Sequence, residues 1–225
     1  MQRVPEPELM TGEAQCRAYA EADFSEAHDR FIALLNEKHP HLAAKGVALD
    51  LGCGNGDVSR RFLRAHPGWA LVGLDGSPAM LAWAQRQSRS AGLAGRTRFV
   101  QALLRPRAAE TGERPALPRA DLLICNSLLH HLPQPAALWD ALAQAAPGTP
   151  IFVMDLLRPE SEAAAAALRD RYAADAPEIL RRDFHNSLRA AYELPELRAQ
   201  LTAASLPHLS LQPASDRHWI AWGEI

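Results

Sequence analysis

Cysteines, long apolar runs and blocks of like charge are scarce in this sequence, and each scarcity excludes a class of protein. The three cysteines, Cys16, Cys53 and Cys125, lie far apart and form no Cys-x-x-Cys pair, so we expect neither a disulfide framework nor a cysteine zinc site. No apolar run approaches the roughly 20 residues that a membrane-spanning helix needs, and the first residues contain no apolar stretch of the signal-peptide type. We therefore expect a reduced, cytoplasmic protein without a membrane partner.

The charges are balanced and scattered. The 225 residues contain 24 Lys and Arg against 26 Asp and Glu, for a net charge of −2. The strong basic surface of a duplex-binding protein is missing, so no nucleic-acid partner is expected. A hydrophobic share of 48% and this length are typical of one globular domain with a buried core.

The centre of the chain alternates between strand and helix patterns. Short apolar runs of buried-strand type are found at residues 47–51, 69–74, 97–102, 121–125 and 151–156. Helical patterns follow at residues 58–65, from Ser77-Pro78 onward with Ser77 as N-cap, and at residues 135–146. This order predicts parallel strands in a doubly wound α/β sheet.

The two flanks of this core are different. The first ten residues are rich in Pro and Glu and are expected to be extended, and residues 13–20 and 25–38 read as helices. Helical patterns follow the fifth strand at 160–175, 178–188 and 196–204. They exceed the dozen or so residues that a single crossover between two strands needs. Strands at 209–212 and 218–222 predict an antiparallel hairpin at the edge of the sheet. We expect one domain, 1–225, with a seven-stranded sheet. It divides into a helical cap (1–45), a core (46–157), a helical insertion or lid (158–207) and a hairpin (208–225).

A glycine-rich loop joins the first strand to the helix after it. Its sequence is Asp50-Leu51-Gly52-Cys53-Gly54-Asn55-Gly56, and glycines there allow a sharp turn and a close approach of backbone to ligand. A tight structural turn is the alternative, but the Asp at the strand end favours a ligand site. The Gly-x-Gly-x-Gly spacing also differs from the Gly-x-Gly-x-x-Gly of nicotinamide dinucleotide loops.

Two further motifs lie at the ends of later strands. Asp75, in the run Leu71-Val72-Gly73-Leu74-Asp75-Gly76-Ser77, ends the second strand about twenty residues after the loop. A carboxylate there can accept both hydrogen bonds of a ribose diol, a feature that dinucleotide dehydrogenases share. The fourth strand runs into Cys125-Asn126-Ser127-Leu128-Leu129-His130-His131-Leu132-Pro133.

Together these motifs resemble class I, Rossmann-like, S-adenosylmethionine-dependent methyltransferases of the small-molecule type, over roughly residues 47–157. The resemblance implies an enzyme that transfers a methyl group from S-adenosyl-L-methionine to a small molecule and leaves S-adenosyl-L-homocysteine. The Asp/Asn-Pro-Pro-aromatic tetrad of nucleic-acid amino-methyltransferases is absent after the fourth strand. A different enzyme using the same cofactor and a non-catalytic cofactor-binding module are the alternatives.

The resemblance also implies a set of cofactor contacts. It places Asp50, Gly52, Gly54 and Gly56 around the amino-acid portion, and Asp75 and Gly76 near the ribose. Met80 would pack near the adenine, with a core position as its alternative. No acid follows the third strand, so the backbone of Ala102 or Leu103, or the Gln101 amide, would meet the adenine amine. Asn126 and, from the N-terminal helices, Tyr19 complete the set.

Histidines and arginines supply the candidate catalytic and acceptor-binding groups. His131 is the candidate general base, since imidazole titrates near neutral pH; a structural role in its motif is the alternative. No metal is expected, because adjacent residues such as His130 and His131 rarely face the same way. A site in which His130, His131, His185 and His218 gather around an ion in three dimensions is the alternative.

Ligands of open α/β sheets bind beyond the carboxyl ends of the strands, and this rule selects the acceptor residues. They are Arg158, Arg217 and His218. His185 is added from the polar patch at residues 181–187 of the insertion, which reads either as a substrate-lid surface or as a solvated helix end. The two arginines favour an anionic acceptor, unless each pairs locally with Asp155 or Asp216. The acceptor itself, the atom methylated and the oligomeric state are left open.

Overall fold

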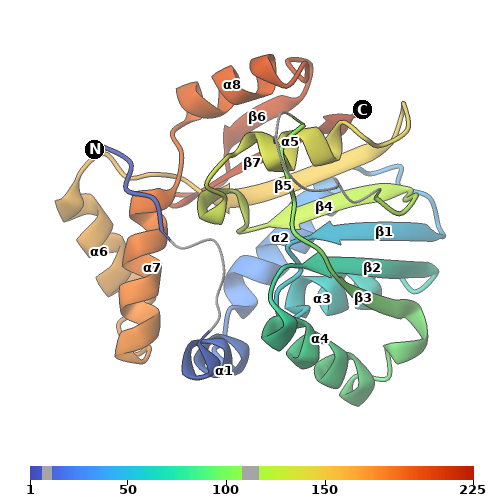
Figure 1. Ribbon diagram of the computed structural model, residues 1–225, viewed down its shortest axis with the longest axis horizontal. Coiled ribbons are helices and arrows are strands. Elements are labelled where there is room, and N and C mark those ends of the chain that lie inside the picture. The colour runs from blue at the N-terminus through green and yellow to red at the C-terminus, as the bar shows by residue number, and fades with distance from the viewer. Residues whose placement is uncertain (7–11, 108–116) are drawn as a thin grey trace.

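A seven-stranded sheet forms the centre of the protein. The computed structural model describes residues 1–6, 12–107 and 117–225, and the strand order is β3-β2-β1-β4-β5-β7-β6 (Figure 1). The strands are β1 (Gly46–Leu51), β2 (Trp69–Asp75), β3 (Thr97–Gln101), β4 (Leu122–Asn126), β5 (Pro150–Leu156), β6 (Ser210–Pro213) and β7 (His218–Glu224). The strands β1 to β5 pair in parallel, whereas β7 runs antiparallel between β5 and β6. The predicted α/β fold with a C-terminal antiparallel hairpin is confirmed.

The helices follow the predicted pattern. They are α1 (Glu13–Glu21), α2 (Ser25–Lys38), α3 (Asp57–Ala65), α4 (Pro78–Ser90), α5 (Ala136–Leu142), α6 (Glu162–Tyr172), α7 (Glu178–Ala190) and α8 (Leu194–Ala203), with short 3₁₀ turns η1 (Ala94–Arg96) and η2 (Leu129–His131). Ser77 caps α4 as expected, because its hydroxyl accepts the Met80 N–H at 3.3 Å. Helix α5 ends four residues earlier than predicted, ahead of Pro147, which cannot continue a helix. Residues 1–6 form no helix or strand, and the rest of the segment predicted to be extended lies outside the described residues.

Strand periodicity builds one core on each face of the sheet. In β4, Leu122 and Ile124 pack with α2 and α3, while Leu123 and Cys125 pack with α5 and α8. Alternate residues of a strand point to opposite faces, so an all-apolar strand serves both cores. Both faces are covered, as doubly wound sheets require.

The strand order reverses between β1 and β4, and this reversal sets where a ligand can bind. From β1 the chain proceeds outward to β2 and β3, then returns to β4 on the other side. Such a switch point opens a crevice at the carboxyl ends of the strands. Helix α1 packs against α4 and α7 beside this edge, and the N-terminal segment runs along α7 (Figure 1). None of the described helices is both long and apolar enough to cross a membrane.

Candidate active site

The loop after β1 depends on its glycines for its path. Gly52, Gly54 and Gly56 all have positive φ, at 73°, 53° and 73°, a conformation that other residues adopt only at a cost. A Cβ on Gly52 would lie 2.7 Å from the Leu128 side chain, whereas a Cβ on Gly54 would meet nothing within 4 Å. The backbone at Gly54 therefore borders open space in which a ligand can approach closely.

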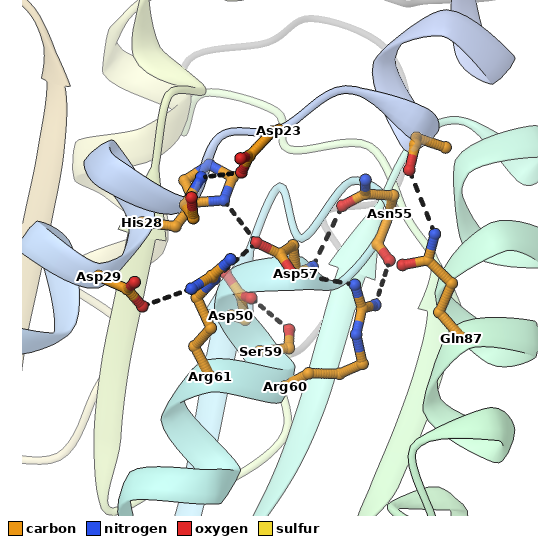
Figure 2. Close-up of polar contacts among 12 residues, drawn as sticks. Asp23, His28, Asp29, Asp50, Asn55, Asp57, Ser59, Arg60, Arg61 and Gln87 are labelled. Carbon is orange, nitrogen blue, oxygen red and sulfur yellow. Dashed lines mark hydrogen bonds and ion pairs between the residues drawn. The ribbon is translucent and has the colours of Figure 1, made fainter.

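A layer of polar side chains holds this loop from behind (Figure 2). Arg60 is buried and donates to the Asn55 carbonyl at 2.7 Å and to the Asp57 carboxylate at 3.1 Å. Asp57 also accepts from Nδ1 of His28 and Nε of Arg61, each at 2.8 Å. Burial alone would raise the pKa of Asp57, but the hydrogen bonds and charges of His28 and Arg61 lower it well below its usual range. The start of α3 is thus a fixed, ionised anchor for the loop.

Two aspartates end β1 and β2 beside the loop. Asp75 accepts the Gly54 and Ser77 N–H groups, both at 2.8 Å. An ionised carboxylate offers about four lone-pair sites, so capacity for a ligand's hydroxyls is left. Burial raises the pKa of Asp75. Burial also raises the pKa of Asp50 to about 7, although the Ser59 hydroxyl, which donates to Asp50 at 2.5 Å, acts to lower it. Asp50 therefore changes charge near neutral pH, beside the candidate ligand site.

These groups line one cavity, which we call the glycine-loop cavity. Nearly all of the predicted cofactor residues border it, namely Tyr19, Asp50, Gly52, Gly54, Asp75, Gly76, Met80, Ala102, Leu103 and Asn126. Gly56 does not border it; a Cβ there would lie 3.1 Å from Ala84, so this glycine packs beneath the loop instead. The Gln101 amide donates to the Gly76 carbonyl at 3.3 Å, and residues 102–104 form the cavity wall after β3.

A second and larger cavity opens beside the first, and we call it the insertion cavity. It encloses about 1660 Å³ of space, open solvent included, against about 960 Å³ for the glycine-loop cavity. Part of its wall is aromatic or apolar and comes from the cap and the insertion, including Phe24, Tyr172, Leu180 and Phe184. Five residues border both cavities: Tyr19, His28, Asn126, Ser127 and His131. Two ligands bound side by side would meet at these five residues.

The shared wall contains two unusual groups at the end of β4. Oδ1 of Asn126 is buried, and no described residue hydrogen-bonds to it, an arrangement that costs free energy unless a ligand or water supplies a donor. Ser127 has φ of 53°, a strained conformation for a residue other than glycine, and such strain clusters at functional sites. Both features make this wall a candidate for ligand contact.

The predicted acceptor residues divide into two pairs. Arg217 and His218 border the insertion cavity, but Arg158 and His185 are absent from its wall and from that of the glycine-loop cavity. Arg158 is buried and bonds Glu193 and Glu196 at the start of α8, at 2.9 and 3.1 Å. His185 faces Glu162 of α6, with Nε2 at 3.5 Å from the carboxylate.

Arg217 and His218 differ in charge. The Arg217 guanidinium lies 3.3 Å from the centre of the Tyr172 ring, with Glu26 at 3.5 Å and Asp216 at 3.7 Å. Burial, and then the charge of Arg217, lower the pKa of His218 to about 3, so this histidine is neutral at physiological pH. Its Nδ1 hydrogen-bonds the Ser215 hydroxyl at 3.0 Å.

The two adjacent histidines face the same carboxylate, contrary to the sequence expectation. In the tight turn η2 their ring centres are 4.2 Å apart. Glu6 Oε1 lies 3.2 Å from Nδ1 of His131 and 3.5 Å from Nε2 of His130. Among the described residues, these three form the group whose ligand atoms, within 4.8 Å of one another, could surround an ion. The absence of a metal stays a prediction.

The structure adds three residues that the sequence did not single out. Glu6 is one, from a segment with no pattern beyond its Pro and Glu content. His28 and Asp57 are the others; His28 borders both cavities and is held by Asp57. Asp57 directly follows Gly56, and this position was the one sequence signal that could have pointed to it. His28 had no such signal, because nothing in the sequence pairs a helix of the cap with the glycine loop.

The comparisons with known proteins agree with this geometry. Residues 49–151 match the profile of the family described as "Methyltransferase domain". This central part of the chain thus resembles a methyltransferase domain, and the sheet around it has the fold of class I, S-adenosylmethionine-dependent methyltransferases.

Similarity to individual proteins extends over part of the chain. A trans-aconitate 2-methyltransferase of Methylobacterium nodulans is 37% identical over 126 residues, which are 56% of this chain and 43% of that protein. A ubiquinone biosynthesis O-methyltransferase of Pseudoalteromonas translucida is 32% identical over 109 residues, 48% of this chain and 42% of that protein. The matched part is thus less than half the length of either relative.

A solved structure covers nearly the whole chain. The plantazolicin methyltransferase BpumL, in complex with a triazolic desmethylPZN analog and SAH, superposes with a TM-score of 0.66 over 94% of this chain and 89% of its own, at 13% identity. At that identity the likeness establishes the fold.

Proposed function

We propose that the protein binds S-adenosylmethionine in the glycine-loop cavity and transfers its methyl group to a small molecule in the insertion cavity. The observation that carries this proposal is the shared wall: the glycine loop and Asp75 border one cavity, and a second, part-apolar cavity meets it at His28, Asn126 and His131. The relatives named for small-molecule methylation and the neighbour with SAH bound support it.

The residues of the first cavity fit this cofactor. The open space at Gly54 accommodates the amino-acid end, the carboxylate of Asp75 can accept a ribose diol, and the unsatisfied Oδ1 of Asn126 can accept from an ammonium group. Met80, Ala102 and Leu103 offer an apolar wall for the adenine. When bound, the cofactor supplies a methyl carbon already activated by its sulfonium.

The chain itself mainly orients the acceptor and excludes water. The cap (1–45) contributes Phe24 to the wall of the insertion cavity, and the insertion (158–207) contributes Tyr172 and Phe184. We infer that the insertion acts as the acceptor lid and that His131, which borders both cavities, is the general base for an acceptor that must lose a proton.

The proposed setting is a reduced, cytoplasmic one. The buried cysteines Cys16, Cys53 and Cys125 form no disulfide, which supports it.

Calorimetry tests the cofactor. S-adenosylhomocysteine should bind and nicotinamide dinucleotides should not.

Asp75→Asn should weaken S-adenosylhomocysteine binding by at least about tenfold, since hydrogen bonds to a charged group are worth roughly 1.5–3 kcal/mol each. The matched control is Asp121→Asn, which alters a carboxylate that accepts the Val47 N–H at 2.8 Å outside both cavities. Dinucleotide binding without S-adenosylhomocysteine binding would end the proposal.

The acceptor's charge is a separate part of the proposal. We infer an acidic group on the acceptor, bound at Arg217, whose neighbours Glu26 and Asp216 lie at the long end of ion-pair distances. Once an acceptor is identified, Arg217→Ala should raise its KM strongly and leave the Kd for S-adenosylhomocysteine unchanged. Arg169→Ala, which removes a partly exposed arginine paired with Asp170 outside both cavities, is the control. A neutral acceptor, or an Arg217→Ala enzyme with unaltered KM, would exclude this role.

A further inference from the structure

The loop between β6 and β7 joins three parts of the chain beside the insertion cavity. Asp216 in this loop accepts from the Tyr172 hydroxyl at 2.8 Å and from Nη1 of Arg171 at 3.2 Å, both at the end of α6. The Arg217 guanidinium lies 3.3 Å from the centre of the Tyr172 ring, and its Nη2 lies 3.5 Å from Glu26 of α2. The insertion, the cap and the sheet therefore meet at Arg217.

Arg217 is buried without a short ion pair. It is only 7% exposed, yet the carboxylates of Glu26 and Asp216 lie 3.5 and 3.7 Å from its guanidinium. Arg158, which is 8% exposed, differs, because two carboxylates lie 2.9 and 3.1 Å from its guanidinium. A guanidinium has five N–H donors, and among the described residues those of Arg217 make one hydrogen bond, to Glu26. The other donors are available to a ligand, and burial makes them costly to leave unused.

The Tyr172 ring supports one flat face of this guanidinium. A guanidinium is planar and its N–H bonds lie in that plane, so stacking on a ring leaves the donors free at its edge. The Tyr172 hydroxyl is itself fixed by Asp216, and the Arg217 carbonyl accepts the Leu157 N–H at 2.9 Å directly after β5. Both the ring and the backbone of Arg217 are thus fixed, which favours two-point binding of a carboxylate.

This pair of side chains lies away from the wall that the two cavities share. Tyr172 and Arg217 border the insertion cavity but not the glycine-loop cavity. Strand β5 separates β4, which ends at the shared wall, from β7, which begins directly after Arg217. Neighbouring strands lie about 4.8 Å apart, so these ends of β4 and β7 are separated by about 10 Å across the sheet. A group held at Arg217 therefore lies away from the glycine-loop cavity.

The rest of the wall of the insertion cavity is apolar or carries exposed charge. Its apolar side chains include Phe24, Leu180 and Phe184. Four carboxylates also border the cavity, those of Asp23, Glu26, Asp175 and Asp183. The first three are exposed, where water and salt screen their charge, and the fourth pairs with Arg182 at 3.2 Å. Of the carboxylates and guanidinium groups on this wall, only that of Arg217 belongs to a buried residue.

We propose that Arg217, supported by Tyr172, binds a carboxylate of the acceptor that is not the group methylated. The proposal rests on the proposed function and narrows its substrate class to small carboxylic acids with an apolar body and a separate nucleophilic group. That second group lies at the shared wall. Its lone pair forms the new bond to the methyl carbon, the electron pair of the broken bond stays on the sulfur, and the proton of the nucleophile leaves to water. The carboxylate stays free in the product, and Tyr172 is a positioning residue because it acts through Arg217.

The matched probes benzoate and benzamide test this before an acceptor is known. They share an apolar ring and differ in whether the planar group on it is charged. On the full chain saturated with S-adenosylhomocysteine, benzoate should bind at least about tenfold more tightly than benzamide, because its hydrogen bonds to Arg217 are charge-assisted. The Arg217 Nε–H signal in ¹⁵N–¹H spectra, assigned with Arg217→Gln, should shift during the benzoate titration.

Variants then separate the two side chains. Arg217→Gln should abolish the preference for benzoate. Tyr172→Leu should weaken benzoate binding about threefold or more through the lost cation–π contact, and it should move the Arg217 Nε–H signal, since the ring beside it is gone. Tyr172→Phe keeps the ring and should retain most of the affinity and the signal position. The control Arg169→Ala, on the same helix and outside both cavities, should leave both unchanged.

Three results contradict the proposal. The first is equal affinity for benzoate and benzamide in the unaltered protein, a measurement that needs no variant to fold. The second is a preference for benzoate that persists in Arg217→Gln, which would place the carboxylate elsewhere. The third is a Tyr172→Leu protein with unchanged benzoate affinity and an unmoved Arg217 signal, which would exclude the positioning role of Tyr172.

Two further measurements separate this proposal from the proposed function. Calorimetry should give the same Kd for S-adenosylhomocysteine in the unaltered protein, Arg217→Gln and Tyr172→Leu. If the unaltered protein does not bind S-adenosylhomocysteine, the proposed function fails, while the preference for benzoate is still measured on the unliganded chain. With an identified acceptor, mass spectrometry and NMR of the product should show a free carboxylate. A methyl ester of that carboxylate would overturn this proposal and leave the proposed function standing.

Discussion

Gly54 and Gly92 have similar backbones and differ in what lies beside them. Both have positive φ, 53° and 70°, and a Cβ on either would meet no atom within 4 Å. Only Gly54 borders the glycine-loop cavity. The pair therefore separates the cost of the backbone conformation from the cost of a lost ligand contact.

Replacing each glycine by alanine should cost about 1–2 kcal/mol of unfolding free energy through the left-handed conformation alone. Denaturant unfolding should give similar losses for Gly54→Ala and Gly92→Ala. Calorimetry should then show weaker S-adenosylhomocysteine binding for Gly54→Ala only, because its methyl group projects where the ligand approaches. Equal affinity in the two variants would mean that no ligand contacts the loop at Gly54.

At the scale of an element, Arg158 belongs to the start of α8. Its buried guanidinium bonds Glu193 and Glu196, and these two residues also form the capping box of that helix. The sequence placed Arg158 at the acceptor site because it follows β5. The rule about strand ends gives the edge of the sheet on which a residue lies, but the direction of a long side chain depends on which charges pack nearby.

Arg158→Ala should therefore act on stability. Loss of charge-assisted hydrogen bonds from a buried guanidinium should lower the free energy of unfolding by about 1–3 kcal/mol, measured by denaturant titration. Affinity for S-adenosylhomocysteine should stay constant. Arg169→Ala, in an exposed pair with Asp170, should produce no measurable change in stability. If Arg158→Ala leaves stability unchanged but alters the KM for the acceptor, Arg158 binds the acceptor and the structural role is wrong.

At the scale of the whole molecule, Asp50 should make stability depend on pH. Its pKa is about 7 in the folded protein because of burial, partly offset by the Ser59 hydroxyl, against about 3.9 in an unfolded chain. The folded state thus holds the proton more tightly. The contribution of Asp50 is fully present below about pH 4 and is lost as pH rises through about 7.

Asp50→Asn should remove this loss. Between pH 4 and 7 the free energy of unfolding of the variant should rise relative to the unaltered protein by at most about 1.4 kcal/mol for each pH unit, as denaturant titrations at several pH values would show. Asp121→Asn, at an exposed carboxylate hydrogen bond, provides the comparison. Parallel pH profiles for Asp50→Asn and the unaltered protein would mean that Asp50 ionises at its ordinary pKa.

Local pattern was sufficient for the order of the elements and for most of the glycine-loop cavity. These features depend only on residues that are neighbours in the sequence. They are the strand and helix periods, the Ser77-Pro78 start of α4 and the glycines of the loop after β1. Asp50 and Asp75 follow from them, since parallel strands bring their carboxyl ends to one edge of the sheet.

The sequence by itself therefore determined the fold class and the residues at that edge. Only the tertiary structure decided which long side chains reach the cavities. Glu6 meets His131, which lies 125 positions further along the chain. His28 meets Asp57 where α2 packs on α3, and Arg158 points to α8 instead of the cavity. No local period encodes these pairs, because they depend on how the cap and the insertion pack on the core, where apolar contacts fix the helices and leave the charged groups to find partners.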